Sequence, residues 1–296
     1  MKGARPRRFL DLPPCPAEEA EVVVLPLPLE RTVTYGRGAA TGPRAILEAS
    51  AQIELFDEET GVDFEKGPRI HTAEAIRPGD KPVESYLDEV SRRVRELRGR
   101  FVLSLGGEHT VTYGAARGLV DALGDLTIVQ IDAHADLIDS LEGKRWSHGT
   151  VMRRLWEEGC RLVQIGTRSL SREEHQLVRG GDRVRAFFAH RLEEEWDEAT
   201  RLIGELEGQV YLSLDVDGLD PSVLPSTGTP QPGGLSWKQA TAVLRAVARA
   251  PRARLVGADI VEYVASPNPP GSDLAAAKLA TRLIAYRESA RGERRA

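Results

Sequence analysis

The sequence predicts a single α/β domain built around one largely parallel β-sheet. Short apolar runs of strand length recur along the chain, and stretches with apolar residues every three or four positions separate them. A chain of 296 residues with 41% hydrophobic and 29% charged residues can bury a sizeable core. Because strands and helices alternate without an internal repeat or a long linker, we expect one domain rather than two.

Seven runs are apolar enough to be buried parallel strands. In chain order they are Glu21–Leu25, Phe101–Leu105, Leu126–Ile131, Arg161–Ile165, Val184–Ala189, Gln209–Val216 and Arg254–Val261. Helical spacing of apolar residues is clearest over Tyr86–Leu97, Leu192–Leu206 and Trp237–Ala248. In an open parallel sheet the carboxyl ends of the strands form one edge, so we expect the functional residues to lie there.

Charge and cysteine content narrow the class of function. The formal net charge of -5 argues against a general binder of nucleic acids or anionic membranes, and suits small cationic or neutral partners. The two cysteines, Cys15 and Cys160, are far apart, so we expect free thiols. Residues 1–20 contain basic residues and several prolines but no apolar signal region, which predicts a flexible start of a cytoplasmic protein.

Metal-binding residue types follow the strand Leu126–Ile131 at alternate positions. They are Asp132, His134 and Asp136. Alternate side chains of an extended chain share one face, so we expect these three to point the same way.

Two more strand ends carry similar residues. The strand Gln209–Val216 ends in Asp215 and Asp217, again two positions apart. The strand Phe101–Leu105 leads to Gly106-Gly107-Glu108-His109, where the glycines permit a tight turn that returns His109 over the strand ends. We therefore expect these residues and those of the first strand to converge at one edge.

Such a cluster of aspartates and histidines implies a bound cation, because buried like charges are tolerated when a metal neutralises them. Taken singly, each aspartate could be a turn or helix cap and each histidine an ordinary polar residue. Oxygen-rich ligation with some imidazole and no thiolate favours Mn²⁺. Two ions about 3.5–4 Å apart, bridged by Asp132 and Asp215, would share a water and lower its pKa. His71, His175 and His190 lack such neighbours, and we expect no role for them.

Four motifs in this order, GGEH, DAHAD, SLDVDGLDP and DIVEY, resemble those of the ureohydrolases, the arginase and agmatinase superfamily. The segment LPLERTVTYGRGAATGPRAILEAS resembles the agmatinase entry segment, and the similarity continues into a helix beginning near Ser272. The resemblance implies a three-layer αβα, arginase-like ureohydrolase domain over residues 21–290, with its metal site at the C-terminal strand ends. It also implies a homo-oligomer, a trimer or a hexamer.

The resemblance implies a role for each residue of the motifs. One Mn²⁺ would be bound by His109, Asp132, Asp136 and Asp215, and the other by Asp132, His134, Asp215 and Asp217. A hydroxide bridging the two ions would attack a guanidinium carbon, releasing urea and a primary amine. Asp136, His148 and Glu262 would act in catalysis.

His148 matches the family histidine that passes protons to the leaving amine. Glu262 matches the glutamate that holds the substrate guanidinium through paired acceptors. Thr229 resembles a hydroxyl on a substrate-binding loop. The competing interpretations are a helix-cap neighbour or surface residue for His148, a surface salt bridge for Glu262 and a simple turn for Thr229.

The segment Leu137–Trp146 lacks the asparagine with which arginases hold an α-carboxylate. Asp139 and Glu142 in this segment would repel a carboxylate and attract an amine, so agmatine ranks first as substrate. N1-aminopropylagmatine, guanidinobutyrate and arginine remain alternatives. A two-metal phosphoesterase is disfavoured because its other histidine motifs are missing, and a non-catalytic polyamine-binding relative is disfavoured because His148 and Glu262 are retained.

Overall fold

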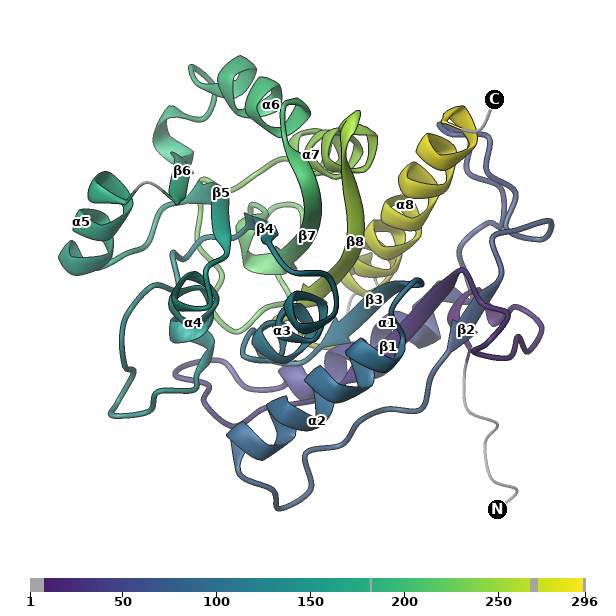
Figure 1. Cartoon of the computed structure of the whole chain (residues 1–296), viewed down its shortest axis with the longest axis horizontal. Helices are drawn as coiled ribbons and strands as arrows, with labels where there is room; N and C mark the ends of the chain where they lie inside the picture. Colours follow the sequence, from purple (N-terminus) through teal and green to yellow (C-terminus); the bar gives the residue numbers. More distant parts are fainter. Residues whose placement is uncertain (1–7, 182, 267–270, 295–296) are drawn as a thin grey trace.

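The computed structural model describes residues 8–181, 183–266 and 271–294, and these contain one eight-stranded sheet (Figure 1). Every strand pairing is parallel, and the strand order is β2-β1-β3-β8-β7-β4-β5-β6. The strands are β1 (Val22–Leu27), β2 (Ile70–Thr72), β3 (Phe101–Gly106), β4 (Leu126–Ile131), β5 (Arg161–Thr167), β6 (Val184–Phe188), β7 (Glu207–Asp215) and β8 (Arg252–Val261).

Helices cover both faces of the sheet, which gives the three-layer αβα arrangement expected from the sequence (Figure 1). One face packs against α1 (Gly42–Ser50), α6 (Trp196–Gly204), α7 (Trp237–Arg249) and α8 (Gly271–Glu293). The other packs against α2 (Val83–Glu96), α3 (Val111–Leu123), α4 (Val151–Glu157) and α5 (Arg172–Gly180).

The two halves of the core follow from the alternation of side chains along each strand. In β1, Val22 and Val24 belong to the first core, and Val23 and Leu25 to the second. Because both faces are covered, successive residues of such a strand are mostly apolar, and this nearly continuous apolar run identified the strands in the sequence.

All seven predicted strands are present, with ends that differ by two residues or fewer. The strand β2 was missed because it is only three residues long and only Ile70 is fully buried. The helix α6 begins at Trp196 rather than near Leu192, since residues 189–195 form a 3-10 turn followed by further turns.

The expectation of a flexible start is wrong for part of residues 1–20. Phe9 and Leu10 are buried in the core. The N–H of Phe9 donates to Thr72 Oγ1 and that of Leu10 to Ser50 Oγ, both at 2.9 Å. Apolar burial and these two bonds fix this segment on α1 and β2. Residues 1–7 lie outside the described part of the chain.

Cys15 and Cys160 are both unpaired, as expected. No helix within the described ranges is long and apolar enough to cross a membrane.

Gly107 is required by a close backbone approach rather than by a tight turn. Its φ is not positive, but a Cβ at this position would lie 2.0 Å from the carbonyl oxygen of Leu29. The N–H of Gly107 donates to Leu27 O at 2.9 Å, which brings the end of β1 against the loop after β3. Glycine at this position therefore lets the segment that follows β1 reach the strand ends.

We expect Gly107→Ala to lower the free energy of unfolding by about 1–3 kcal/mol, because backbone atoms would have to move to admit the methyl group. Gly180→Ala is the matched control, since a Cβ at the end of α5 meets no heavy atom within 4 Å. Thermal unfolding should show a Tm several degrees lower for the first variant and unchanged or higher for the second. Equal Tm values would contradict the interpretation of Gly107.

Candidate metal centre and substrate pocket

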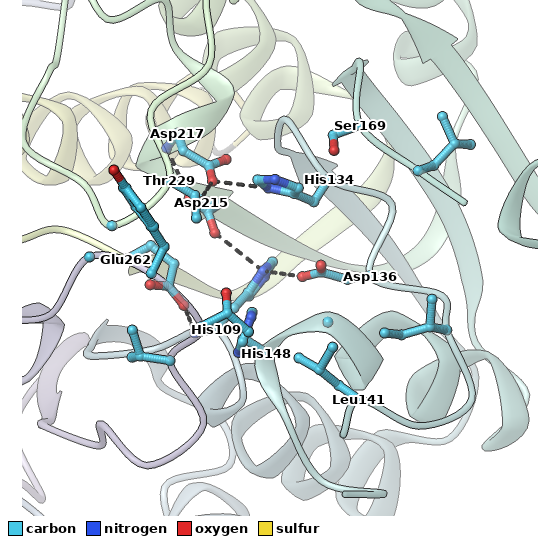
Figure 2. A pocket seen from close by; sticks show the side chains of 18 of the residues that line it. His109, His134, Asp136, Leu141, His148, Ser169, Asp215, Asp217, Thr229 and Glu262 are labelled. Atoms are coloured by element: carbon cyan, nitrogen blue, oxygen red, sulfur yellow. Dashed lines mark hydrogen bonds and ion pairs between the residues drawn. The ribbon is translucent and has the colours of Figure 1, made fainter. Parts of the chain in front are cut away.

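Four neighbouring strands, in the order β3-β8-β7-β4, bring the predicted site residues together. Ile131 pairs with Leu214, and Leu214 with Ile260, so these strands end at the same level. Asp132, Asp215 and Glu262 therefore lie at the ends of three adjacent strands. His109 follows in the loop after β3 and lies near Asp215 and Glu262 (Figure 2).

Two groups of potential metal ligands share Asp132. In the first group, His109 Nδ1 lies 3.1 Å from Asp132 Oδ2 and 2.8 Å from Asp136 Oδ2. In the second, His134 Nδ1 lies 3.6 Å from Asp132 Oδ1 and 3.0 Å from Asp217 Oδ2. One carboxylate thus offers an oxygen to each group, the arrangement needed for a bridged pair of ions.

The residues after β4 do not all point the same way, which corrects the expectation from an extended chain. Asp136 faces His109, whereas His134 faces Asp217 (Figure 2). The chain leaves the strand conformation after Ile131, and Asp136 has a left-handed φ of 54°. Glu262 also has a left-handed φ, of 59°. Such backbone strain is concentrated at functional sites.

A hydroxyl and a carboxylate fix the orientation of His109. The hydroxyl of Ser213 donates to Asp259 Oδ1 at 2.8 Å, so Ser213 Oγ accepts from His109 Nε2–H, also at 2.8 Å. His109 Nδ1 then presents a lone pair, and this buried atom has no hydrogen-bond partner among the described residues. A lone pair facing carboxylate oxygens within 3.4 Å is the environment of a metal ligand.

The buried carboxylates of this centre raise the pKa values of their neighbours, so the cluster favours bound protons or cations. Burial and the charge of Asp132 raise the pKa of Asp136 to about 7. Burial, followed by the charges of Asp217 and Asp132, raises the pKa of Asp215 well above its usual value. Burial disfavours the imidazolium of His134, but the carboxylates of Asp132 and Asp217 outweigh it and raise its pKa to about 11. Divalent cations would neutralise this cluster in place of protons.

We expect Ser213→Ala to weaken metal binding about 10- to 100-fold, because His109 loses the acceptor that sets its tautomer. Competition with a chelator measures this affinity. Ser50→Ala is the control, since Ser50 is also buried and hydrogen-bonded but lies at the end of α1, away from the centre. Equal metal affinity in the two variants would show that Ser213 does not orient a ligand.

Sequence reasoning missed a second set of supporting residues around Asp132. Gln130 Nε2 donates to Asp132 Oδ2 at 2.6 Å, and Gln164 Nε2 donates to Gln130 Oε1 at 2.6 Å. Both glutamines are fully buried inside strands. A buried polar residue in an otherwise apolar strand is the signal that could have identified them, as it could have identified Ser213 and Asp259.

Asp215 and Thr229 adjoin the two groups. Asp215 Oδ2 lies 3.4 Å from His109 Nδ1, and its Oδ1 accepts the N–H of Asp217 at 2.8 Å. The hydroxyl of Thr229 donates to Asp217 Oδ2 at 2.9 Å. The bridging role of Asp215 and the substrate role of Thr229 stay predictions.

A pocket of about 850 Å³, counting its open mouth, lies over the centre (Figure 2). Its lining includes His109, His134 and Asp136. Glu262 lines it, with Oε1 accepting the N–H of His109 at 2.6 Å. Burial, followed by the charge of Glu108, raises the pKa of Glu262 to about 8, although the hydrogen bond from His109 opposes the shift.

His148 begins a 3-10 turn, His148–Thr150, and lines the same pocket. Burial lowers the pKa of its imidazole, and the charge of Glu108 opposes this effect. An imidazole that is neutral near pH 7 can both accept and donate a proton. The other three histidines, His71, His175 and His190, are not among the residues that line the pocket.

Asp139 and Glu142 do not line the pocket, contrary to expectation. Asp139 accepts a hydrogen bond of 2.6 Å from Arg154, whose buried guanidinium needs a carboxylate partner. Glu142 is exposed, with Lys144 3.5 Å away. Ile138 and Leu141 face the pocket instead.

Comparison with known proteins points to one family. The sequence model of the Arginase family matches residues 20–286. The chain is 42% identical over 262 residues to an N(1)-aminopropylagmatine ureohydrolase of Thermus thermophilus, covering 86% of this chain and 85% of that protein. It is 34% identical over 292 residues to the Synechocystis protein of that name, covering 95% and 94%. The crystal structure of an agmatine ureohydrolase of Thermoplasma volcanium superposes with a TM-score of 0.85 and 30% identity, covering 98% and 97%.

Proposed function

Because the chain belongs to the arginase family and is a ureohydrolase, we propose that it releases urea from an agmatine-like polyamine, with N1-aminopropylagmatine as the preferred substrate. The observation that carries this function is the pair of ligand groups sharing Asp132, with Glu262 beside them in the pocket. The reaction adds water across the guanidino C–N bond, so aminopropylagmatine would give spermidine and urea, and agmatine would give putrescine and urea.

Glu262, His148 and Asp136 would each have a separate role in this reaction. Two divalent cations, when bound, would supply the Lewis acidity that makes water nucleophilic near neutral pH. Glu262 would accept hydrogen bonds from the guanidinium and hold its carbon over the centre. His148 would give a proton to the amine nitrogen as the C–N bond breaks. Asp136 would bind metal and so help to activate the water.

Manganese is the cation that we propose for both positions. The donor set consists of carboxylate oxygens and two imidazole nitrogens, without thiolate. Such ligands suit Mn²⁺ better than Zn²⁺ or Cu²⁺. Metal analysis of the purified protein, together with reconstitution by Mn²⁺, Zn²⁺ and Co²⁺, tests this choice.

The pocket supports a substrate with more than one positive charge. Its lining combines carboxylates with the apolar side chains of Val33, Ile138 and Leu141, and none of its described residues is lysine or arginine. Apolar walls suit a polymethylene chain, and a carboxylate substrate would meet like charge. These features disfavour arginine and guanidinobutyrate. The names of the Thermus and Synechocystis relatives favour aminopropylagmatine over agmatine, which reverses the order expected from the sequence.

Urea release by the manganese-loaded protein tests the function, with aminopropylagmatine, agmatine, guanidinobutyrate and arginine assayed side by side. We expect the highest kcat/KM for aminopropylagmatine, a lower value for agmatine and little activity on the two carboxylates. Preference for agmatine would restore the order expected from the sequence. No urea from any of the four, with two metals bound per chain, would contradict the function.

A further inference from the structure

A fully buried carboxylate, Glu108, lies outside both groups of potential ligands and is surrounded by donors. Its Oε2 accepts the backbone N–H groups of Arg31 at 2.6 Å and Thr32 at 2.7 Å. Its Oε1 accepts the hydroxyls of Thr32 at 3.0 Å and Thr110 at 2.7 Å. Glu108 thereby ties the segment after β1 to the loop after β3.

The Thr32 hydroxyl connects this carboxylate to His148. Thr32 Oγ1 accepts the backbone N–H of His148 at 3.2 Å and lies 3.1 Å from His148 Nδ1. A hydroxyl has one proton and two lone pairs. Both oxygens of Glu108 accept from other donors, and the Thr32 hydroxyl donates its proton to Oε1, so both lone pairs of Thr32 Oγ1 face His148. The nitrogen Nδ1 must then carry a proton.

We propose that Thr32, held by Glu108, is a positioning residue that fixes His148 as the Nδ1–H tautomer and leaves Nε2 for proton transfer in the pocket. In this tautomer the neutral imidazole carries its proton on Nδ1, and the imidazolium carries a proton there as well. The hydrogen bond to Thr32 therefore persists through the proton-transfer cycle, and the ring does not have to turn between the two states.

This role rests on the proposed function and extends it to the N-terminal segment. Thr32 is followed directly by Val33, Thr34, Tyr35 and Gly36, which line the pocket. The segment that forms one wall of the substrate pocket therefore also orients the residue that protonates the leaving amine.

Thr32→Val and Thr32→Ser test this positioning role in the manganese-loaded protein. Valine has nearly the same shape but no hydroxyl, so we expect kcat to fall about 10- to 100-fold, part of the contribution of a positioned acid. KM should change less than about threefold, and bound metal should stay the same. Serine keeps the hydroxyl and should restore kcat to within about threefold of the original protein. A serine variant as slow as the valine variant would overturn the role of the hydroxyl.

Two further comparisons separate orientation of His148 from damage to the Glu108 network. Thr110→Val removes another donor to Glu108 but no hydrogen bond to His148, so its loss of kcat should be much smaller. In a His148→Ala background, Thr32→Val should cause little additional loss, because the two residues act as one unit. Multiplicative losses in the double variant would show that Thr32 acts elsewhere.

The tautomer itself can be measured without any substrate. ¹⁵N spectra of the histidine-labelled full chain, recorded metal-free and with a diamagnetic divalent cation, should show His148 protonated at Nδ1, with assignment from His148→Gln. Thr32→Val should shift the resonance towards the other tautomer or a mixture. An Nε2–H tautomer in the original protein would overturn the proposal, even if urea were released. The expected tautomer without urea from any guanidine would sink the proposed function alone.

Discussion

Asp132→Ala should abolish both the binding of a pair of metal ions and the release of urea. Asp132 is the one residue that belongs to both groups of potential ligands in the described part of the chain. Its loss removes one carboxylate oxygen near His109 and one near His134. We expect bound manganese to fall from about two ions per chain to one or fewer. Urea release should fall about 1,000-fold or more, since metal Lewis acidity supplies several kcal/mol.

Metal analysis, urea release and thermal unfolding check this expectation. A metal bound to the folded state raises Tm, so the increase on adding Mn²⁺ should shrink in Asp132→Ala. Asp88→Ala is the matched control, because Asp88 lies on α2, is exposed and pairs with Arg117 of α3. It should keep two ions and full activity. An Asp132→Ala protein that still binds two ions and hydrolyses substrate would refute the shared ligand.

The sequence was sufficient for all the described strands except the short β2, and for the convergence of the site, because both are local patterns. A continuous apolar run identifies a buried strand, and polar residues directly after it lie at the sheet edge. Asp132, Asp215 and His109 were placed by this reasoning, and the structure brings them together.

The supporting residues depend on which strands become neighbours, which the sequence does not reveal. Ser213 and Asp259 are paired across β7 and β8, but they are 46 positions apart in the chain. Thr32 and His148 meet only after the segments following β1 and β4 have folded over the same strand ends. The direction in which a loop side chain points cannot be predicted from the sequence either. Asp139 was expected to face the substrate, but it accepts a hydrogen bond from the buried Arg154.

Glu262→Gln should separate substrate binding from metal binding. In the structure Glu262 Oε1 accepts the N–H of His109, and Oε2 has no hydrogen-bond partner among the described residues. Glutamine keeps an acceptor for His109 but has no negative charge to offer a guanidinium. Removing one partner of a buried charge pair costs about 2–5 kcal/mol, so we expect kcat/KM to fall about 30- to 5,000-fold. Bound manganese should stay close to that of the unmodified protein.

Glu262→Gln separates substrate binding from metal binding better than Glu262→Ala does. Glu262→Ala would also leave the buried N–H of His109 without an acceptor, and this could displace a metal ligand for a reason unrelated to substrate. Glu142→Gln provides the matched control, since that carboxylate is exposed and does not line the pocket. It should change kcat/KM little. If Glu262→Gln lost as much manganese as Asp132→Ala, Glu262 would be supporting the metals, and the guanidinium would have to be held by another carboxylate of the pocket.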